Sequence, residues 1–117
     1  MPIPTYNNTG GADGLPPMVR SFIPAPGTLI MRVSGDSMND AGILDGDYLY
    51  VDTKQAARNG SIVAAYLDGE QIVKRYEDRN GSAWLHAENP KYMDIEVAEY
   101  LSFHFIGVVV GLMRSLV

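Results

Sequence analysis

Two turn dipeptides constrain the fold of this chain most. Asp68-Gly69 joins the runs 61–67 and 70–77, and Asn80-Gly81 leads from the second run into 82–87. Both positions of a two-residue hairpin loop need positive φ, which Asp, Asn and Gly tolerate. The runs around them are rich in the branched and aromatic residues that strands prefer. The sequence therefore predicts consecutive antiparallel hairpins.

Three further runs carry a strand signal. They are 29–34, 47–52 and 103–112, the last of which contains three consecutive valines. No long amphipathic helix pattern occurs, and at most a helical turn is expected from Met38 to Ala41. We therefore predict a mainly β domain, built as a small twisted sheet or a partly open barrel.

The first 28 residues differ from the rest of the chain. They hold six of its seven prolines and the glycine-rich stretch 9–14, a composition that favours extended or turning backbone. The total length of 117 residues suits one compact domain. We predict an arm over residues 1–28 and a single domain over residues 29–117.

The composition excludes several classes of function. The chain has no cysteine, which excludes disulfides, thiolate metal sites and a cysteine nucleophile. Its net charge of −5, without a Lys/Arg cluster, makes it a poor candidate for binding a nucleic-acid backbone. The apolar run 103–113 is shorter than the ~20 residues of a membrane-spanning helix, and the start of the chain does not resemble a secretory signal. We expect a soluble, cytoplasmic protein without a membrane partner.

A serine follows a glycine-containing bend at the end of the predicted strand 29–34, the first in the domain. In the segment 33–38 (VSGDSM), Gly35 permits a tight turn and Ser37 follows it. Such a position presents a hydroxyl at a sheet edge, where backbone N–H groups can face a developing oxyanion. Serines beside glycine are also common in turns without any catalytic role. The segment by itself leaves both interpretations open.

Lys74 is the candidate base for this serine. Strand alternation places it on one face with Ile72 and Tyr76. Burial on that face would disfavour the charged ammonium, lower the pKa of Lys74 and let the neutral amine take a proton from a hydroxyl. A lysine whose stem lies on the sheet and whose head stays in water fits the same periodicity. Spacing alone does not assign the pair.

Taken together, the motifs resemble the C-terminal self-cleavage domain of the LexA, UmuD and phage-repressor family, the S24-type peptidases. The matching segments are 33–38 and 42–47 around the serine, 60–65, 68–70 and 73–75 around the lysine, 87–92 with a Glu-Asn pair, and 105–114 as closing strand. They follow the family's order and spacing over roughly residues 28–117. Two separated motifs plus a closing strand are more specific than either motif alone.

The resemblance implies a mechanism. Ser37 would attack a peptide bond of its own polypeptide, with Lys74 as general base and the backbone N–H groups of Ser37 and Met38 as oxyanion donors. It also implies a homodimer, no cofactor and activation by the RecA–single-stranded DNA filament in the SOS response to DNA damage. DNA would be bound only through a separate domain of a transcriptional repressor.

The scissile bond is unassigned. The family cuts most often after alanine or cysteine and before glycine, and no such bond lies upstream of Ser37. The nearest candidates are the bonds after Thr9 and Gly10. We favour the interpretation that the chain is a fragment whose cut lies further upstream; the alternative is a diverged site within the arm.

Two other functions of the domain remain open. One is a UmuD-like accessory subunit of a translesion DNA polymerase, and the other is a dimerisation module that does not cleave. A signal peptidase uses related chemistry but would need a membrane anchor.

No metal site is predicted. The aspartates at positions 36, 40, 45, 47 and 52 do not have calcium-loop spacing, and Asp45-Gly46-Asp47 is typical of a turn. His86 and His104 lie in separate predicted strands, and neither receives a role.

Overall fold

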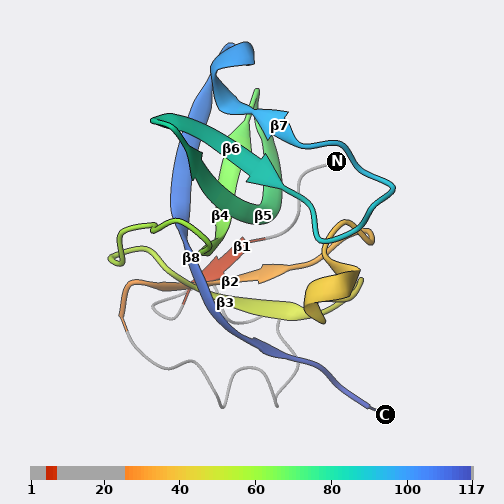
Figure 1. The fold of residues 1–117 in the computed structure, drawn as a ribbon. Coiled ribbons are helices and arrows are strands. Elements are labelled where there is room, and N and C mark those ends of the chain that lie inside the picture. Colours follow the sequence, from red (N-terminus) through yellow and green to blue (C-terminus); the bar gives the residue numbers. More distant parts are fainter. Residues whose placement is uncertain (1–4, 8–25, 117) are drawn as a thin grey trace.

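The computed structural model describes the backbone of residues 5–7 and residues 26–116 with their side chains (Figure 1). The chain forms one sheet of eight strands in the order β1-β2-β3-β8-β4-β5-β6-β7, with every neighbouring pair antiparallel. The strands are β1 (Thr5–Asn7), β2 (Thr28–Arg32), β3 (Tyr48–Asp52), β4 (Ile62–Leu67), β5 (Glu70–Arg79), β6 (Ser82–His86), β7 (Ile95–Glu96) and β8 (Phe103–Met113). β1 and β7 are its two edges, so the sheet is not closed into a barrel. The predicted mainly β architecture is confirmed.

The two predicted hairpins are present. Asp68 and Gly69 join β4 to β5 with φ of 48° and 84°, and Asn80 and Gly81 join β5 to β6 with φ of 53° and 86°. Positive φ at both loop residues gives the backbone twist that matches the flanking strands. The turn residues thus fix the register of β4, β5 and β6.

Strand β8 connects the two halves of the sheet. Figure 1 shows it running from the hairpins of β4–β7 down to β2 and β3. It pairs with both β3 and β4, and each pairing contains a register shift, between Tyr50 and Val51 in β3 and between Ala64 and Ala65 in β4. Such irregularities bend a strand and increase its local twist. β8 can therefore pair with β3 in one half and with β4 in the other without closing the sheet.

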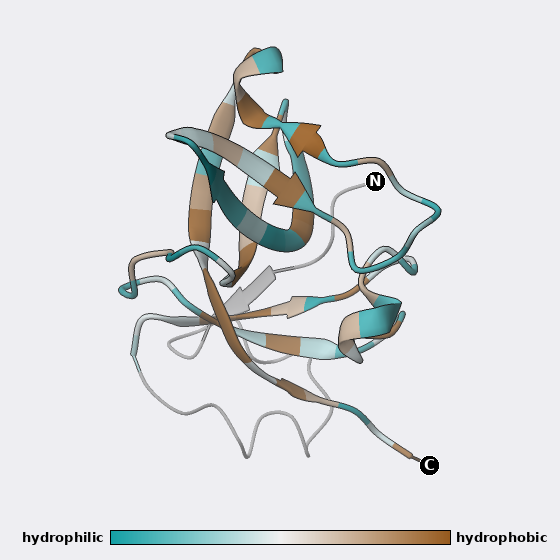
Figure 2. Ribbon diagram, viewed as in Figure 1, coloured by the Kyte–Doolittle hydropathy of each residue, from teal (hydrophilic) through white to brown (hydrophobic). Residues whose placement is uncertain are grey.

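The core lies against the segment that carries Ser37. Its buried members are Met31, Met38, Ile43, Leu49, Val51, Ala64 and Val73. Five of them come from strands, and Figure 2 shows hydrophobic residues recurring along the strands of the sheet. Met38 and Ile43 are 2% and 3% exposed. Both come from the loop between β2 and β3, so burying them anchors that loop on the sheet.

Several local predictions needed correction. The helical turn expected from Met38 is the 3₁₀ turn η1 (Asn39–Ala41), and a second 3₁₀ turn, η2 (Val97–Glu99), was not predicted. β1 and β7 were also missed, because three and two residues carry no periodic signal and take their hydrogen bonds from a neighbouring strand. Only residues 5–7 and 26–28 of the predicted arm are described. Across the described ranges, no helix is long and apolar enough to cross a membrane.

Candidate active site

An open cleft of about 210 Å³ lies between the loop after β2 and the start of β5. Its lining consists of residues 33–38 and 70–74 together with Ile43 and Tyr92. Ser37 and Lys74, 37 residues apart in sequence, therefore line one cleft. The two residues singled out from the sequence are brought together by the fold.

Hydrogen bonds to the following loop hold the Ser37 turn in place. Val33 accepts a bond from the Gly46 N–H at 2.8 Å, and the Gly35 N–H donates to the Asp45 carboxylate at 2.8 Å. Gly35 has a φ of 95°, in the left-handed region that favours glycine. The predicted glycine bend is present, and buried Met38 fixes the chain directly after Ser37.

Lys74 is half-buried on the cleft side of β5. Strand alternation turns the neighbouring Gln71 and Val73 to the buried side, at 7% and 8% exposure. Burial lowers the pKa of Lys74 from its ordinary value of 10.5, and the negative charge of Glu70 partly opposes this change. The desolvation that favours a neutral lysine thus arises in the cleft, on the face opposite the core side of the strand.

Tyr92 joins the two sides of the cleft. The centroid of its ring lies 5.2 Å from the Lys74 ammonium nitrogen, and its hydroxyl donates a hydrogen bond to the Asp36 carboxylate. Asp36 also pairs with the Lys91 ammonium at 3.4 Å. The Tyr92 bond lowers the pKa of Asp36 and raises that of Tyr92. In the sequence, Tyr92 is distinguished only by its place in the segment 87–92.

The segment 87–92 also binds the Ser37 turn through its backbone and Asn89. The Asn89 side chain donates to the Asp36 carbonyl at 2.8 Å. The Asp40 N–H donates to the Glu88 carbonyl at 2.8 Å, and the Glu88 N–H lies 3.4 Å from the Met38 sulfur. The Glu-Asn motif therefore has a direct structural role beside Ser37.

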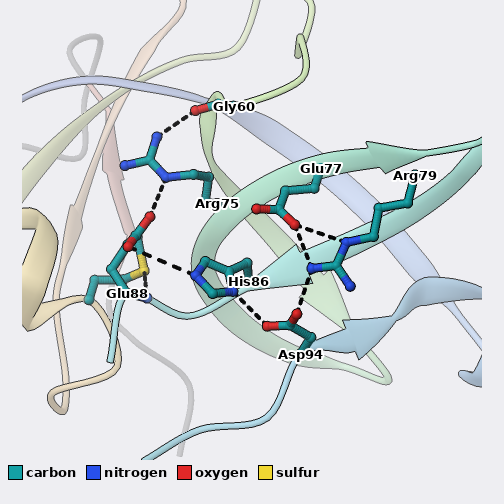
Figure 3. A network of polar contacts seen from close by, with 8 residues as sticks. Gly60, Arg75, Glu77, Arg79, His86, Glu88 and Asp94 are labelled. Atoms are coloured by element: carbon teal, nitrogen blue, oxygen red, sulfur yellow. Dashed lines mark hydrogen bonds and ion pairs between the residues drawn. The ribbon is translucent and has the colours of Figure 1, made fainter. Parts of the chain in front are cut away.

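A polar network continues from Glu88 along β5 and β6 (Figure 3). Arg75 donates to the Glu88 carboxylate and, at 2.6 Å, to the Gly60 carbonyl. His86 contacts Asp94 at 2.6 Å through Nδ1 and Glu88 at 3.9 Å through Nε2. The bond to Asp94 raises the pKa of His86 above its ordinary 6.5. His86 thus belongs to an ion-pair network that the sequence did not reveal.

One group in the described part of the chain has a metal-like spacing. Potential ligand atoms of Glu77, His86 and Asp94 lie within 4.8 Å of one another. The Arg79 guanidinium donates to Glu77 and to Asp94, each at 2.5 Å, and thereby supplies positive charge between the two carboxylates. The group is accounted for as an ion-pair network. His104 is exposed on β8.

Asp47 is the most deeply buried charged group among the described residues. The Arg114 guanidinium donates two hydrogen bonds to its carboxylate, from Nε to Oδ1 at 2.7 Å and from Nη2 to Oδ2 at 2.6 Å. The Leu44 N–H donates to Oδ2 at 2.8 Å, and Arg114 also donates to the Gly42 carbonyl at 2.9 Å. The guanidinium is the main reason that the pKa of Asp47 lies below 3.8. Arg114 therefore ties the end of β8 to the loop that follows Ser37 in sequence.

The candidate cleavage positions, Thr9 and Gly10, lie outside the described residues. The 45–47 segment forms the expected turn, with a hydrogen bond from the Asp47 N–H to the Leu44 carbonyl at 3.0 Å and a positive φ at Gly46.

A serine on a glycine turn that shares a cleft with a lysine of lowered pKa is the arrangement of the serine hydrolases that use lysine as base. Comparison with known proteins agrees with this class. The profile of the "Peptidase S24-like" family matches residues 1–110, and the chain belongs to that family.

Curated relatives support the same assignment. The chain is 45% identical over 87 residues to a LexA repressor of Shewanella piezotolerans and 48% identical over 86 residues to one of Ectopseudomonas mendocina. These matches cover 74% and 73% of the chain and 42% of each relative. A LexA repressor of Frankia alni is 45% identical over 91 residues, which are 77% of the chain and 35% of that relative. The chain spans less than half the length of these proteins.

Proposed function

We propose that the chain is the C-terminal self-cleavage and dimerisation domain of a LexA-type transcriptional repressor, with Ser37 as nucleophile and Lys74 as general base. The observation that carries the proposal is the cleft that Ser37 and Lys74 both line, in which burial favours the neutral form of Lys74. Family membership and the LexA names of the relatives support the peptidase class and the repressor context.

In the proposed reaction, the neutral Lys74 amine takes the proton of the Ser37 hydroxyl while the serine oxygen attacks a peptide carbonyl. The resulting ammonium gives that proton to the leaving amine as the carbon–nitrogen bond breaks. Water then hydrolyses the ester on Ser37 and regenerates both groups. No step needs a cofactor.

The backbone around Ser37 suits the oxyanion role. Within the described residues, the backbone N–H groups of Val33, Gly35 and Asn39 each donate a hydrogen bond to another group of the protein. The N–H groups of Ser37 and Met38 remain as candidate donors to an oxyanion at the cleft.

The proposed substrate is a bond in the same polypeptide. A tethered substrate reaches a high effective concentration, so cleavage would be controlled by whether the upstream segment docks in the cleft. We propose the RecA–single-stranded DNA filament as the signal that favours docking. The operator would be bound by another domain, since this chain carries a net charge of −5.

The proposed dimer contact is strand β8. Val110 and Leu112 are 52% and 38% exposed on it, so the strand presents apolar surface that a second copy could cover. Sedimentation equilibrium tests this contact. A monomer at high protein concentration would count against pairing.

The catalytic assignment is tested by labelling with a fluorophosphonate, which modifies activated serines and needs no scissile bond. The rate of Ser37 modification, followed by peptide mass spectrometry, is expected to rise with pH as Lys74 loses its proton. Ser37→Ala and Lys74→Ala should abolish it, whereas replacing the exposed Lys54 by alanine should leave it unchanged. Modification of Ser37 that persists at the same rate in Lys74→Ala would remove the lysine from the mechanism and favour a dimerisation module.

A further inference from the structure

Tyr92 contacts Lys74 and Asp36, on opposite sides of the cleft, through different parts of one side chain. Its ring lies 5.2 Å from the Lys74 ammonium, and its hydroxyl donates to the carboxylate of Asp36, the residue before Ser37. The ring face attracts a cation, and the charge-assisted hydrogen bond fixes the turn. One contact is to the proposed base, and the other is to the residue next to the proposed nucleophile.

Packing in the core does not explain these contacts. Tyr92 is 43% exposed, and its hydroxyl is bound at the cleft instead of in the core. Its own segment is independently tied to the Ser37 turn through Asn89, which donates to the Asp36 carbonyl. Tyr92 is thus presented at the cleft by a segment that is already attached there.

We propose that Tyr92 is a positioning residue that holds the Ser37 turn through Asp36 and holds the Lys74 head group through its ring. The inference rests on the proposed function of Ser37 and Lys74 and adds a residue to it. Through the ring, Tyr92 favours the charged form of Lys74 and so raises the pH at which the lysine becomes a base.

The charged and titratable groups around Lys74 can be named for each side of the cleft. Glu70, on the same strand, opposes deprotonation through its negative charge. Asp36 lies across the cleft with its carboxylate bound by Tyr92 and Lys91, and Tyr92 itself has a raised pKa. Burial is the largest influence and favours the neutral amine. A substitution at Tyr92 must be interpreted against these groups.

Two variants separate the two contacts. Tyr92→Phe keeps the ring and removes the hydroxyl, whereas Tyr92→Leu removes both and retains an apolar side chain. Tyr100→Leu is the matched control, because Tyr100 is 40% exposed and is absent from the lining of the cleft. Each variant is first checked for cooperative thermal unfolding.

The measurement is the rate of Ser37 modification by a fluorophosphonate across pH. Tyr92→Phe should lower the high-pH plateau by about tenfold, because the hydrogen bond to the Asp36 carboxylate is lost, and leave the midpoint unchanged. Tyr92→Leu should lower the plateau and also move the midpoint down by about half a pH unit, because the charged lysine loses the ring. Tyr100→Leu should change neither quantity.

Two results would overturn the inference: a Tyr92→Leu profile that matches Tyr100→Leu, or a lowered plateau whose midpoint does not move. The second would reduce Tyr92 to structural support. If wild-type Ser37 is not modified, or is modified independently of Lys74, the proposed function fails. An NMR titration of the Lys74 side chain then still tests the ring contact. In it, Tyr92→Leu must lower the pKa of Lys74 relative to wild type.

Discussion

Replacing Asp47 by asparagine isolates the contribution of the buried ion pair behind the Ser37 turn. Asp47 is 1% exposed, and its carboxylate accepts two hydrogen bonds from Arg114 and one from the Leu44 N–H. An amide can replace one accepting oxygen but turns a donor toward groups that are themselves donors. The substitution therefore removes the charge and creates a donor conflict.

The expected loss of stability follows from how deeply Asp47 and Arg114 are each buried. A hydrogen bond to a charged group contributes about 1.5–3 kcal/mol, and three of them end on this carboxylate. The Arg114 side chain is 37% exposed, so water can take over part of its hydrogen bonding once the partner is neutral. We expect Asp47→Asn to lower the free energy of unfolding by about 2–3 kcal/mol near neutral pH.

Urea unfolding followed by circular dichroism measures this loss. With a slope of about 1–3 kcal/mol per molar urea, the midpoint should fall by about 0.7–3 M at pH 7. Asp40→Asn is the control, because that carboxylate is exposed, and its change should stay within about 0.5 kcal/mol.

The pH dependence gives a sharper test. The pKa of Asp47 in the folded state lies below its ordinary 3.8, so its stabilisation is complete above that value and is lost as the pH falls through the folded-state pKa. Wild type and Asp47→Asn should thus differ fully at pH 7 and converge in strong acid. A difference that stays constant with pH, or is absent at pH 7, would refute the role assigned to the ion pair.

Two further predictions concern packing and titration. Gly107→Ala should destabilise the domain by about 1–3 kcal/mol in urea unfolding, because a Cβ there would lie 2.5 Å from the Asp52 carbonyl oxygen, whereas Gly111→Ala, whose nearest contact is 3.5 Å, should change stability little. His86 has a raised pKa through Asp94, so its pairing stabilises below the unfolded-state value near 6.5 and is lost as the pH rises through the folded-state pKa. Unfolding midpoints from pH 6 to 9 should therefore decline less in His86→Asn than in wild type; equal slopes would exclude this pairing as the source.

Much of the strand pattern was predictable because it is local. The Asp68-Gly69 and Asn80-Gly81 loops need positive φ, and the runs around them alternate or cluster as strands do. The structure confirms those strands to within a few residues at each end. β7 could not be predicted, because a two-residue strand is created by its neighbour β6 and not by its own composition.

The candidate site was predictable in part. The motifs point to Ser37 and Lys74, and both residues line one cleft in the structure. Tyr92, Arg114 and His86 were not selected, because each takes its significance from a partner at least eight residues away in sequence: Asp36, Asp47 and Asp94 respectively. Such pairings leave no periodicity in the sequence.

The sequence by itself determined the β class, the two hairpins and the glycine bend that carries Ser37, since each depends on the backbone preferences of a few adjacent residues. Only the tertiary structure decided the surroundings of Lys74. Strand alternation assigns it to a face, but whether that face meets water, the core or a cleft depends on the loop that packs across it. Burial in the cleft at the Ser37 turn lowers the pKa of this lysine, which is the physical basis for the proposed chemistry.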